Sequence, residues 1–145
     1  MKTLYLASFA LLVLTFYSCD KDSLSDDLIG DWQIYTIEHK NCSDPEDNTN
    51  GPVLYTDGCL DNAEVGTNCL TMSFSKDGTL TETTDAGSYM STGIYTYTVD
   101  EEANEIVFCK VDNNQECYEL EYIDNELVYK ESQNGCESQA NFRKI

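Results

Sequence analysis

The clearest structural signal in this sequence is the stretch from Cys69 to Thr84, which has the sequence CLTMSFSKDGTLTETT. Met72 and Phe74 alternate with polar residues, which places both on one face of an extended strand. Lys76-Asp77-Gly78 then forms a tight turn, because glycine takes a positive φ angle without strain. Residues 79–84 run back and are rich in β-branched threonine. The stretch therefore predicts a β-hairpin.

The same pattern recurs along the chain beyond Leu28. Eight short runs alternate apolar and polar residues between turn residues: Gly30 to Glu38, Cys69 to Ser75, Thr79 to Thr84, Gly93 to Val99, Glu105 to Lys110, Cys117 to Ile123, Glu126 to Glu131 and Gln139 to Lys144. No convincing helical period follows Leu28, and at most Ser25 to Ile29 makes one turn before the first strand. The sequence therefore predicts an all-β fold with little or no helix. Eight antiparallel strands in a meander are enough to close into an up-and-down barrel, which removes exposed edges.

The connection from His39 to Asn68 interrupts the meander. It is rich in Asn, Asp, Gly and Pro, and long irregular loops in compact domains are usually functional or disordered. Its two cysteines argue that it is pinned down. It also holds oxygen-bearing side chains that could bind calcium, but their spacing matches no defined calcium loop, so we expect no metal there; these are Asp44, Glu46, Asp47 and Asn48.

The N-terminus has the pattern of a secretory signal. Lys2 precedes a mostly apolar run from Leu4 to Phe16, which is too short to span a bilayer as a helix. A small residue directly before Cys19 resembles the lipobox of bacterial lipoproteins, which implies removal of residues 1–18 and lipid attachment to Cys19. An ordinary secretory signal, with Cys19 used in a disulfide, is the alternative. A short polar linker from Asp20 to Asp27 would follow.

Charge and cysteine count limit the function of the mature chain. Without Lys2 it carries seven Lys and Arg against 27 Asp and Glu, a formal net charge of −20, which repels nucleic acid. The sequence has seven cysteines, an odd number that calls for an explanation in an exported protein. Lipidation of Cys19 leaves six for three disulfides. A structural zinc site is disfavoured, because no C-x-x-C pair occurs and His39 is the only histidine.

Three short motifs carry a resemblance to a known family. Leu28 to Trp32 fits "L-x-G-x-W", Phe74 to Thr79 fits "F-x-x-D-G-T", and Tyr122 to Leu127 fits a "D/N-x-L" turn. With the meander, these motifs resemble the lipocalin superfamily, in particular the small lipocalin-like lipoproteins of Bacteroidetes, over residues 28–145. The acidic linker resembles that of surface-exported lipoproteins of the same group.

This resemblance implies roles for particular residues. Trp32 would plug the closed end of the barrel, and Arg143, the only arginine, would pack across it. The long first loop would lie over the open end as a lid. Within such a barrel the first and eighth strands are neighbours, so of the fifteen pairings that six cysteines allow we expect three. They are Cys42 with Cys136, Cys59 with Cys69 and Cys109 with Cys117.

The sequence shows no catalytic constellation. His39 has no nucleophilic partner at a recognisable spacing, and neither a phosphate-binding glycine loop nor a serine elbow is present. We therefore expect a protein that is not an enzyme and needs no cofactor. It would be anchored by lipid to the bacterial outer membrane, and the linker is consistent with display at the cell surface.

Two functions remain. The barrel could bind a small apolar or amphipathic ligand, or it could be a filled, structural or partner-binding envelope lipoprotein. The residues expected to face inward are bulky and aromatic, which favours a filled barrel, although tyrosine hydroxyls could instead line a partly polar pocket. They are Ile34, Met72, Phe74, Tyr95, Tyr97, Phe108, Tyr118, Leu120, Tyr122 and Tyr129. The ligand and the oligomeric state stay open.

Overall fold

A computed structural model describes residues 23–62, 66–112, 116–133 and 135–145. The predicted signal peptide and Cys19 lie outside these residues. In the described part of the chain, no helix is long and apolar enough to cross a membrane.

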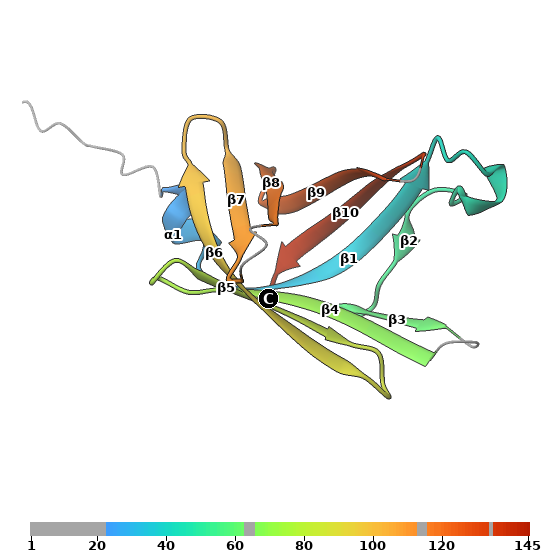
Figure 1. The fold of residues 1–145 in the computed structure, drawn as a ribbon, viewed down its shortest axis with the longest axis horizontal. Helices are drawn as coiled ribbons and strands as arrows, with labels where there is room; N and C mark the ends of the chain where they lie inside the picture. Colours follow the sequence, from blue (N-terminus) through green and yellow to red (C-terminus); the bar gives the residue numbers. More distant parts are fainter. Residues whose placement is uncertain (1–22, 63–65, 113–115, 134) are drawn as a thin grey trace, which may run out of the picture.

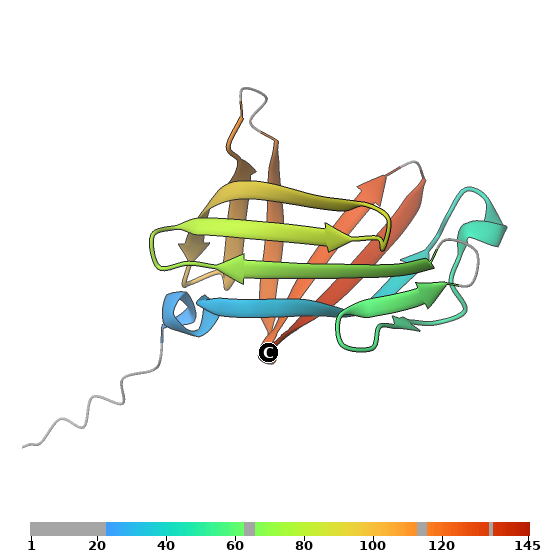
Figure 2. The same cartoon turned by 90° about the horizontal axis from the view of Figure 1, so that it is seen from below.

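The chain forms a closed antiparallel β-barrel of eight strands (Figures 1 and 2). One sheet runs in the order β2-β1-β10-β9-β8-β7-β6-β5-β4-β3, and pairing of β1 with β4 closes it into a barrel. The barrel strands are β1 (Gly30–Lys40), β4 (Gly66–Phe74), β5 (Thr79–Asp85), β6 (Met90–Asp100), β7 (Glu105–Lys110), β8 (Cys117–Ile123), β9 (Glu126–Gln133) and β10 (Cys136–Lys144).

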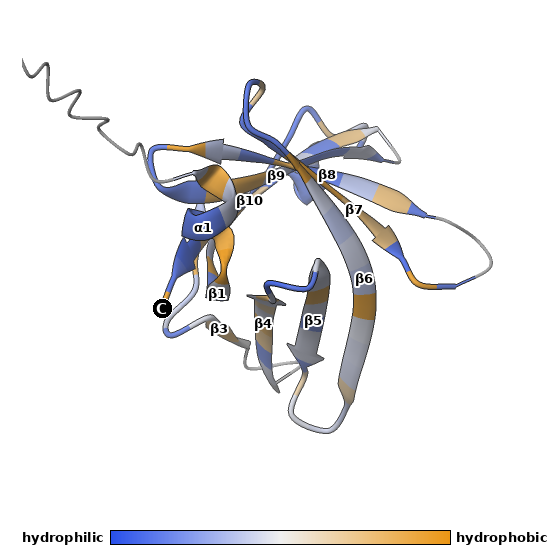
Figure 3. Cartoon of the chain, turned by 90° about the vertical axis from the view of Figure 1, so that its left-hand side faces the viewer, coloured by the Kyte–Doolittle hydropathy of each residue, from blue (hydrophilic) through white to orange (hydrophobic). Residues whose placement is uncertain are grey.

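All eight predicted strands are present, and the predicted fold class is confirmed. The hairpin turn at Gly78 has a φ angle of 84°, as the sequence predicts. Helical structure is limited to α1 (Leu24–Leu28) and a 3₁₀ turn, η1 (Pro45–Asp47), among the described residues. Polar and apolar segments are interspersed along the strands (Figure 3), because alternate side chains face the interior.

The barrel has a closed end, at which α1 lies. Leu24 and Leu28 of α1 are buried. Leu24 lies within the predicted linker, whereas Leu28 is the first residue of the predicted barrel domain. Glu101, in the turn after β6, holds the helix by accepting hydrogen bonds from Leu24 N at 2.8 Å and Ser25 N at 3.0 Å. Trp32 is 1% exposed, and its Nε1 donates to the Leu28 carbonyl oxygen at 2.8 Å. Helix and indole together fill this end.

The cation over the indole is Lys144, so the prediction for Arg143 is wrong. The Lys144 ammonium lies 5.9 Å from the Trp32 ring centroid, whereas the Arg143 guanidinium lies 5.9 Å from that of Tyr35. The reason is strand alternation: Phe142 is 1% exposed inside the barrel, so its neighbour Arg143 points outward. Lys144 is the next residue and lies directly opposite Trp32 in the register, so its side chain is on the same face as the indole.

The long connection is more ordered than the sequence predicts. It contains η1, β2 (Val53–Leu54) and β3 (Cys59–Asn62). β2 pairs with β1 and β3 pairs with β4, so the two short strands occupy the gap where β1 and β4 diverge (Figure 1). The described part of the connection thus extends the barrel wall, which corrects the expectation of a lid over the open end.

Three disulfides link the pairs that the sequence predicts. Each joins cysteines of adjoining strands or of their ends, with Cα–Cα distances of 3.9 to 4.0 Å; the pairs are Cys42–Cys136, Cys59–Cys69 and Cys109–Cys117. All three lie in the half of the barrel away from α1, which we call the open half. A disulfide typically contributes about 2–4 kcal/mol, chiefly by restricting the unfolded chain. The buried core, the β1–β4 closure and these disulfides all lie within residues 23–145.

Candidate functional site

The open half of the barrel contains a cavity of about 310 Å³. Each of the eight barrel strands contributes at least one side chain to its wall. The lining residues are Ile34 and Ile37 (β1), Leu70 and Met72 (β4), Glu82 (β5), Tyr95 (β6), Phe108 (β7), Tyr118 (β8), Tyr129 (β9), and Ala140 and Phe142 (β10).

The ten inward residues predicted from the sequence divide into two groups. Six line the cavity: Ile34, Met72, Tyr95, Phe108, Tyr118 and Tyr129. The other four pack in the closed half, where Phe74 meets Tyr97 edge to face at 5.1 Å, Trp32 meets Tyr122 at 6.3 Å, and Leu120 is fully buried. The barrel is therefore filled near α1 and hollow at the open half.

Five lining residues were not predicted. Leu70 and Glu82 stand in phase with Met72 and Leu80, so strict alternation along their strands could have identified them. Ile37 could not have been identified in this way, because a register shift between Ile34 and Thr36 brings both isoleucines of β1 to the inner face. The remaining two, Ala140 and Phe142, lie opposite β1 on β10.

Aromatic rings form a continuous wall on one side of the cavity. Phe108 stacks on Tyr118 at 5.3 Å and meets Tyr95 edge to face at 5.2 Å. Tyr118 also lies 6.3 Å from Tyr95 and 6.4 Å from Tyr129, all between ring centroids. Such clusters combine a large apolar surface with polar hydroxyls.

Glu82 is the only charged side chain among the described residues that line the cavity. Burial raises the pKa of its carboxyl group above the usual range, while the nearby Tyr95 hydroxyl and the charge of Lys110 act in the opposite direction. Its neighbours in the register are Met72 and Gly93. The carboxylate therefore stands against an apolar interior and partly lacks the solvation that its charge prefers.

Gly93 makes room for Tyr95 beside Glu82. A Cβ atom at residue 93 would lie 2.7 Å from Tyr95 Cε2 and 2.9 Å from its hydroxyl oxygen. The tyrosine ring therefore lies along the backbone of Gly93, which is opposite Glu82, and this places the hydroxyl within reach of the carboxylate. A larger residue at position 93 would displace the ring.

Each of the three cavity tyrosines has a carboxylate near its hydroxyl group. Tyr95 lies near Glu82 and Tyr129 near Glu131, and burial followed by the nearby negative charge raises the pKa of each phenol to about 12. The Tyr118 hydroxyl donates to Glu116 at 3.2 Å, and burial is again the first cause of its raised pKa. All three phenols remain protonated donors at neutral pH.

The barrel wall opens between β8 and β9. Their pairing ends at Leu120 opposite Tyr129; beyond it, residues 117–119 pair with β7 and residues 130–133 pair with β10. A surface hollow of about 370 Å³ lies over this gap, and Tyr118 and Tyr129 line both it and the inner cavity. The two rings therefore lie between the inner cavity and this hollow.

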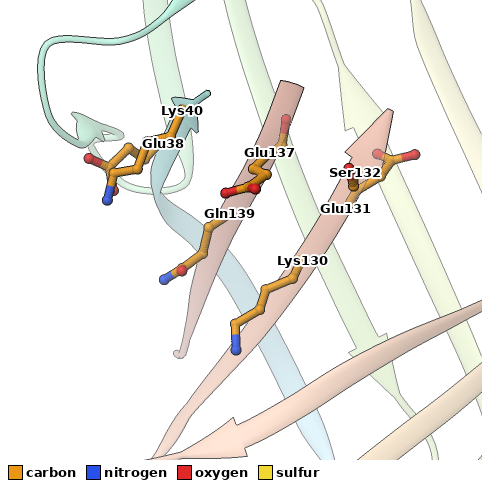
Figure 4. A pocket seen from close by; sticks show the side chains of 8 residues that line it. Glu38, Lys40, Lys130, Glu131, Ser132, Glu137 and Gln139 are labelled. Carbon is orange, nitrogen blue, oxygen red and sulfur yellow. The ribbon is translucent and has the colours of Figure 1, made fainter. Parts of the chain in front are cut away.

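A second surface hollow, of about 430 Å³, has a different character (Figure 4). Its side chains come from β1, β9 and β10 and are mostly charged; they are Glu38, Lys40, Lys130, Glu131, Ser132, Glu137, Ser138 and Gln139. Two of these charges neutralise each other, since the Lys40 ammonium lies 2.7 Å from Glu38 Oε2. An open, ion-paired hollow is a poor site for an apolar ligand.

His39 has a partner that the sequence did not predict. Its Nδ1 lies 2.7 Å from Ser138 Oγ, across the β1–β10 register. This contact links β1 to β10 near the Cys42–Cys136 disulfide. A structural role in holding the two strands together therefore explains the position of His39.

The closed eight-stranded antiparallel barrel is consistent with a lipocalin-like fold. No protein-family model matches the sequence. A comparison with curated proteins likewise finds no match.

Proposed function

We propose that this chain is a non-catalytic, membrane-tethered barrel that binds a small apolar or amphipathic ligand in the cavity of its open half. The observation that carries the proposal is the 310 Å³ cavity, walled by all eight strands. Its volume falls in the range of small-molecule pockets, roughly 300 to 1,000 Å³. Its lining of apolar and aromatic side chains with one carboxylate matches the composition of such pockets.

The anchor in this proposal is lipid on Cys19. The three disulfides use the six other cysteines, so Cys19 is the one that they leave for modification. The proposed protein is a lipocalin-like lipoprotein of the Bacteroidetes type, held at the outer membrane. Intact-mass measurement of membrane-extracted protein should give a chain beginning at Cys19 with added acyl mass. An unmodified chain released into the medium would contradict this part.

The alternative is a partner-binding envelope lipoprotein. One observation favours it: several apolar side chains on and near β6 are exposed, among them Tyr89 (64%), Met90 (66%), Ile94 (55%) and Val111 (60%). Val111 N donates to the Ile94 carbonyl oxygen at 3.1 Å, so these two lie side by side. Such side chains are typical of protein contacts. The hollow interior remains unexplained by this alternative.

A neutral fluorescent probe tests ligand binding. The chain from Ser23 to Ile145, exported as a soluble domain, is titrated with N-phenyl-1-naphthylamine. We expect saturable binding of one probe. Ala140→Phe places a phenyl ring in the cavity and should weaken binding about tenfold or more, the equivalent of 1.4 kcal/mol. Ala103→Phe is the matched control, because Ala103 is exposed in a turn at the closed end. Non-saturable binding, or equal affinity of the two variants, would refute the proposal.

A further inference from the structure

We infer that the preferred ligand is a cationic amphiphile, an amine or quaternary ammonium compound whose charge lies beside Glu82 and whose tail fills the apolar part of the cavity. This inference rests on the proposed function and specifies its ligand class. It goes beyond the expectation from the sequence of a small apolar or amphipathic ligand, because it assigns the sign and the place of the ligand's charge.

The position of the carboxylate favours a cationic ligand. Glu82 belongs to the cavity wall, and the Tyr95 hydroxyl lies near its carboxylate. An ionised carboxylate can accept several hydrogen bonds, so one neighbouring phenol leaves most of its acceptor capacity for a ligand. An ammonium group would supply both the missing donors and the opposite charge.

The aromatic wall also favours a cation. The Tyr95 hydroxyl lies near Glu82, and the Tyr95 ring lies 5.2 Å from Phe108 and 6.3 Å from Tyr118 between centroids. The faces of aromatic rings attract cations, and quaternary ammonium ligands are commonly recognised by such groups of rings. Both the negative charge of the carboxylate and the faces of the aromatic rings therefore favour a cation over an anion.

The charges at the gap between β8 and β9 favour a cation as well. Glu116 accepts a hydrogen bond from the Tyr118 hydroxyl at 3.2 Å, and Glu131 lies near Tyr129. Both tyrosines lie between the cavity and this gap. The chain as a whole has a formal net charge of −19. Negative charge at this gap on a negative protein raises the local concentration of cations and lowers that of anions such as free fatty acids.

Two basic groups compete with this arrangement. Lys130 lines the hollow over the gap between β8 and β9, but its ammonium lies 2.7 Å from Glu121 Oε2. Lys110 follows Phe108 on the inner side of β7, opposite Tyr95 in the register, and its charge acts on Glu82. Its side chain is 44% exposed, however, and its ammonium lies 3.5 Å from Asp112 Oδ2, at the rim. Lys110 is not part of the cavity wall. Its repulsion of a bound cation therefore provides a second test, with the opposite sign.

A series of ligands with one tail and different head groups tests the inference. Isothermal titration of the soluble domain compares octylamine, octyltrimethylammonium, octanol and octanoate. We expect both cations to bind about tenfold more tightly than octanol, and octanoate to bind more weakly than octanol. Glu82→Gln, which keeps a hydrogen-bond acceptor but removes the charge, should abolish the advantage of the cations over octanol. Glu102→Gln removes one exposed charge in a closed-end turn and should leave the series unaltered.

The outcomes separate this inference from the proposed function. Lys110→Gln should strengthen binding of octylamine and not of octanol. If octanol and the naphthyl probe bind but the cations gain nothing, or if their advantage survives Glu82→Gln, the inference is wrong and the ligand-binding function stands. If neither the series nor the probe binds, both are wrong.

Discussion

Replacing Trp32 with alanine removes the side chain that closes the barrel. The indole is 1% exposed, donates to the Leu28 carbonyl oxygen at 2.8 Å and meets Tyr122 edge to face at 6.3 Å. Truncation of a buried aromatic to alanine costs about 3–5 kcal/mol, because apolar contacts are lost and a cavity remains. We expect Trp32→Ala to lower the free energy of unfolding by this amount. Trp32→Phe keeps an aromatic ring but leaves the Leu28 carbonyl without its donor, so it should cost about 1–3 kcal/mol.

Urea unfolding of the soluble domain with its disulfides intact measures these losses. Far-ultraviolet circular dichroism is the appropriate signal, because both variants lack the only tryptophan of the chain. In the wild-type domain, Trp32 should emit at short wavelength, as an indole shielded from water does. A loss below about 1 kcal/mol for Trp32→Ala, or a red, solvent-like emission in the wild type, would show that Trp32 does not close the barrel.

Three further predictions concern the cavity. Gly93→Ala should displace the Tyr95 ring, lower the free energy of unfolding by about 1–3 kcal/mol and weaken probe binding; unchanged stability and affinity would mean that the ring does not need this space. Because burial raises the pKa of Glu82, the folded domain binds its proton more tightly than the unfolded chain does. Unfolding free energy should therefore fall as pH rises through the raised pKa of Glu82, and Glu82→Gln should be more stable than wild type at neutral pH; an identical pH profile for the variant would count against this. The phenols of Tyr95 and Tyr129 have a pKa of about 12 in the folded domain, against 10 in the unfolded chain, so the free energy of unfolding should fall as pH rises from 10 to about 12. Ultraviolet absorbance should show that these two phenols ionise later than the other tyrosines. Complete titration of all tyrosines near pH 10 would contradict this expectation.

The strand pattern was predictable because each strand has one inner face. Alternation in a stretch such as Gly93 to Val99 reports directly on which residues avoid water. The disulfides were predictable for a related reason: once the meander is known, the ends of adjoining strands must lie together. Cys109 and Cys117, for example, flank one turn and are directly opposite in the register.

Features that depend on local departures from alternation were not predictable. The register shift in β1 brings Ile37 inward, and nothing in the apolar pattern marks the position of such a bulge. Arg143 was assigned from the resemblance, although its neighbour Phe142 faces inward and forces it outward. The role of Glu82 in the cavity also escaped prediction, because an acidic residue in a strand is normally expected to face water.

Filled and hollow halves also look alike in the sequence. Both are lined by bulky residues: Phe74 and Leu120 pack tightly near α1, whereas Tyr95 and Tyr118 surround a cavity. The difference depends on where each ring lies, and for Tyr95 this is set by the missing side chain of Gly93. The three disulfides lie in the hollow half, where fewer buried contacts hold the strands together.

The two methionines other than Met1 provide the most direct test of ligand binding in the cavity. Met72 is 4% exposed and lines the cavity, whereas Met90 is 66% exposed at the start of β6. Methyl NMR spectra of the soluble domain, labelled at methionine, should therefore contain two signals that report on the inside and the outside of the barrel. On titration with N-phenyl-1-naphthylamine, we expect the Met72 signal to shift and saturate while the Met90 signal stays in place. A shift confined to Met90, or two signals that do not move at all, would contradict a ligand-binding barrel.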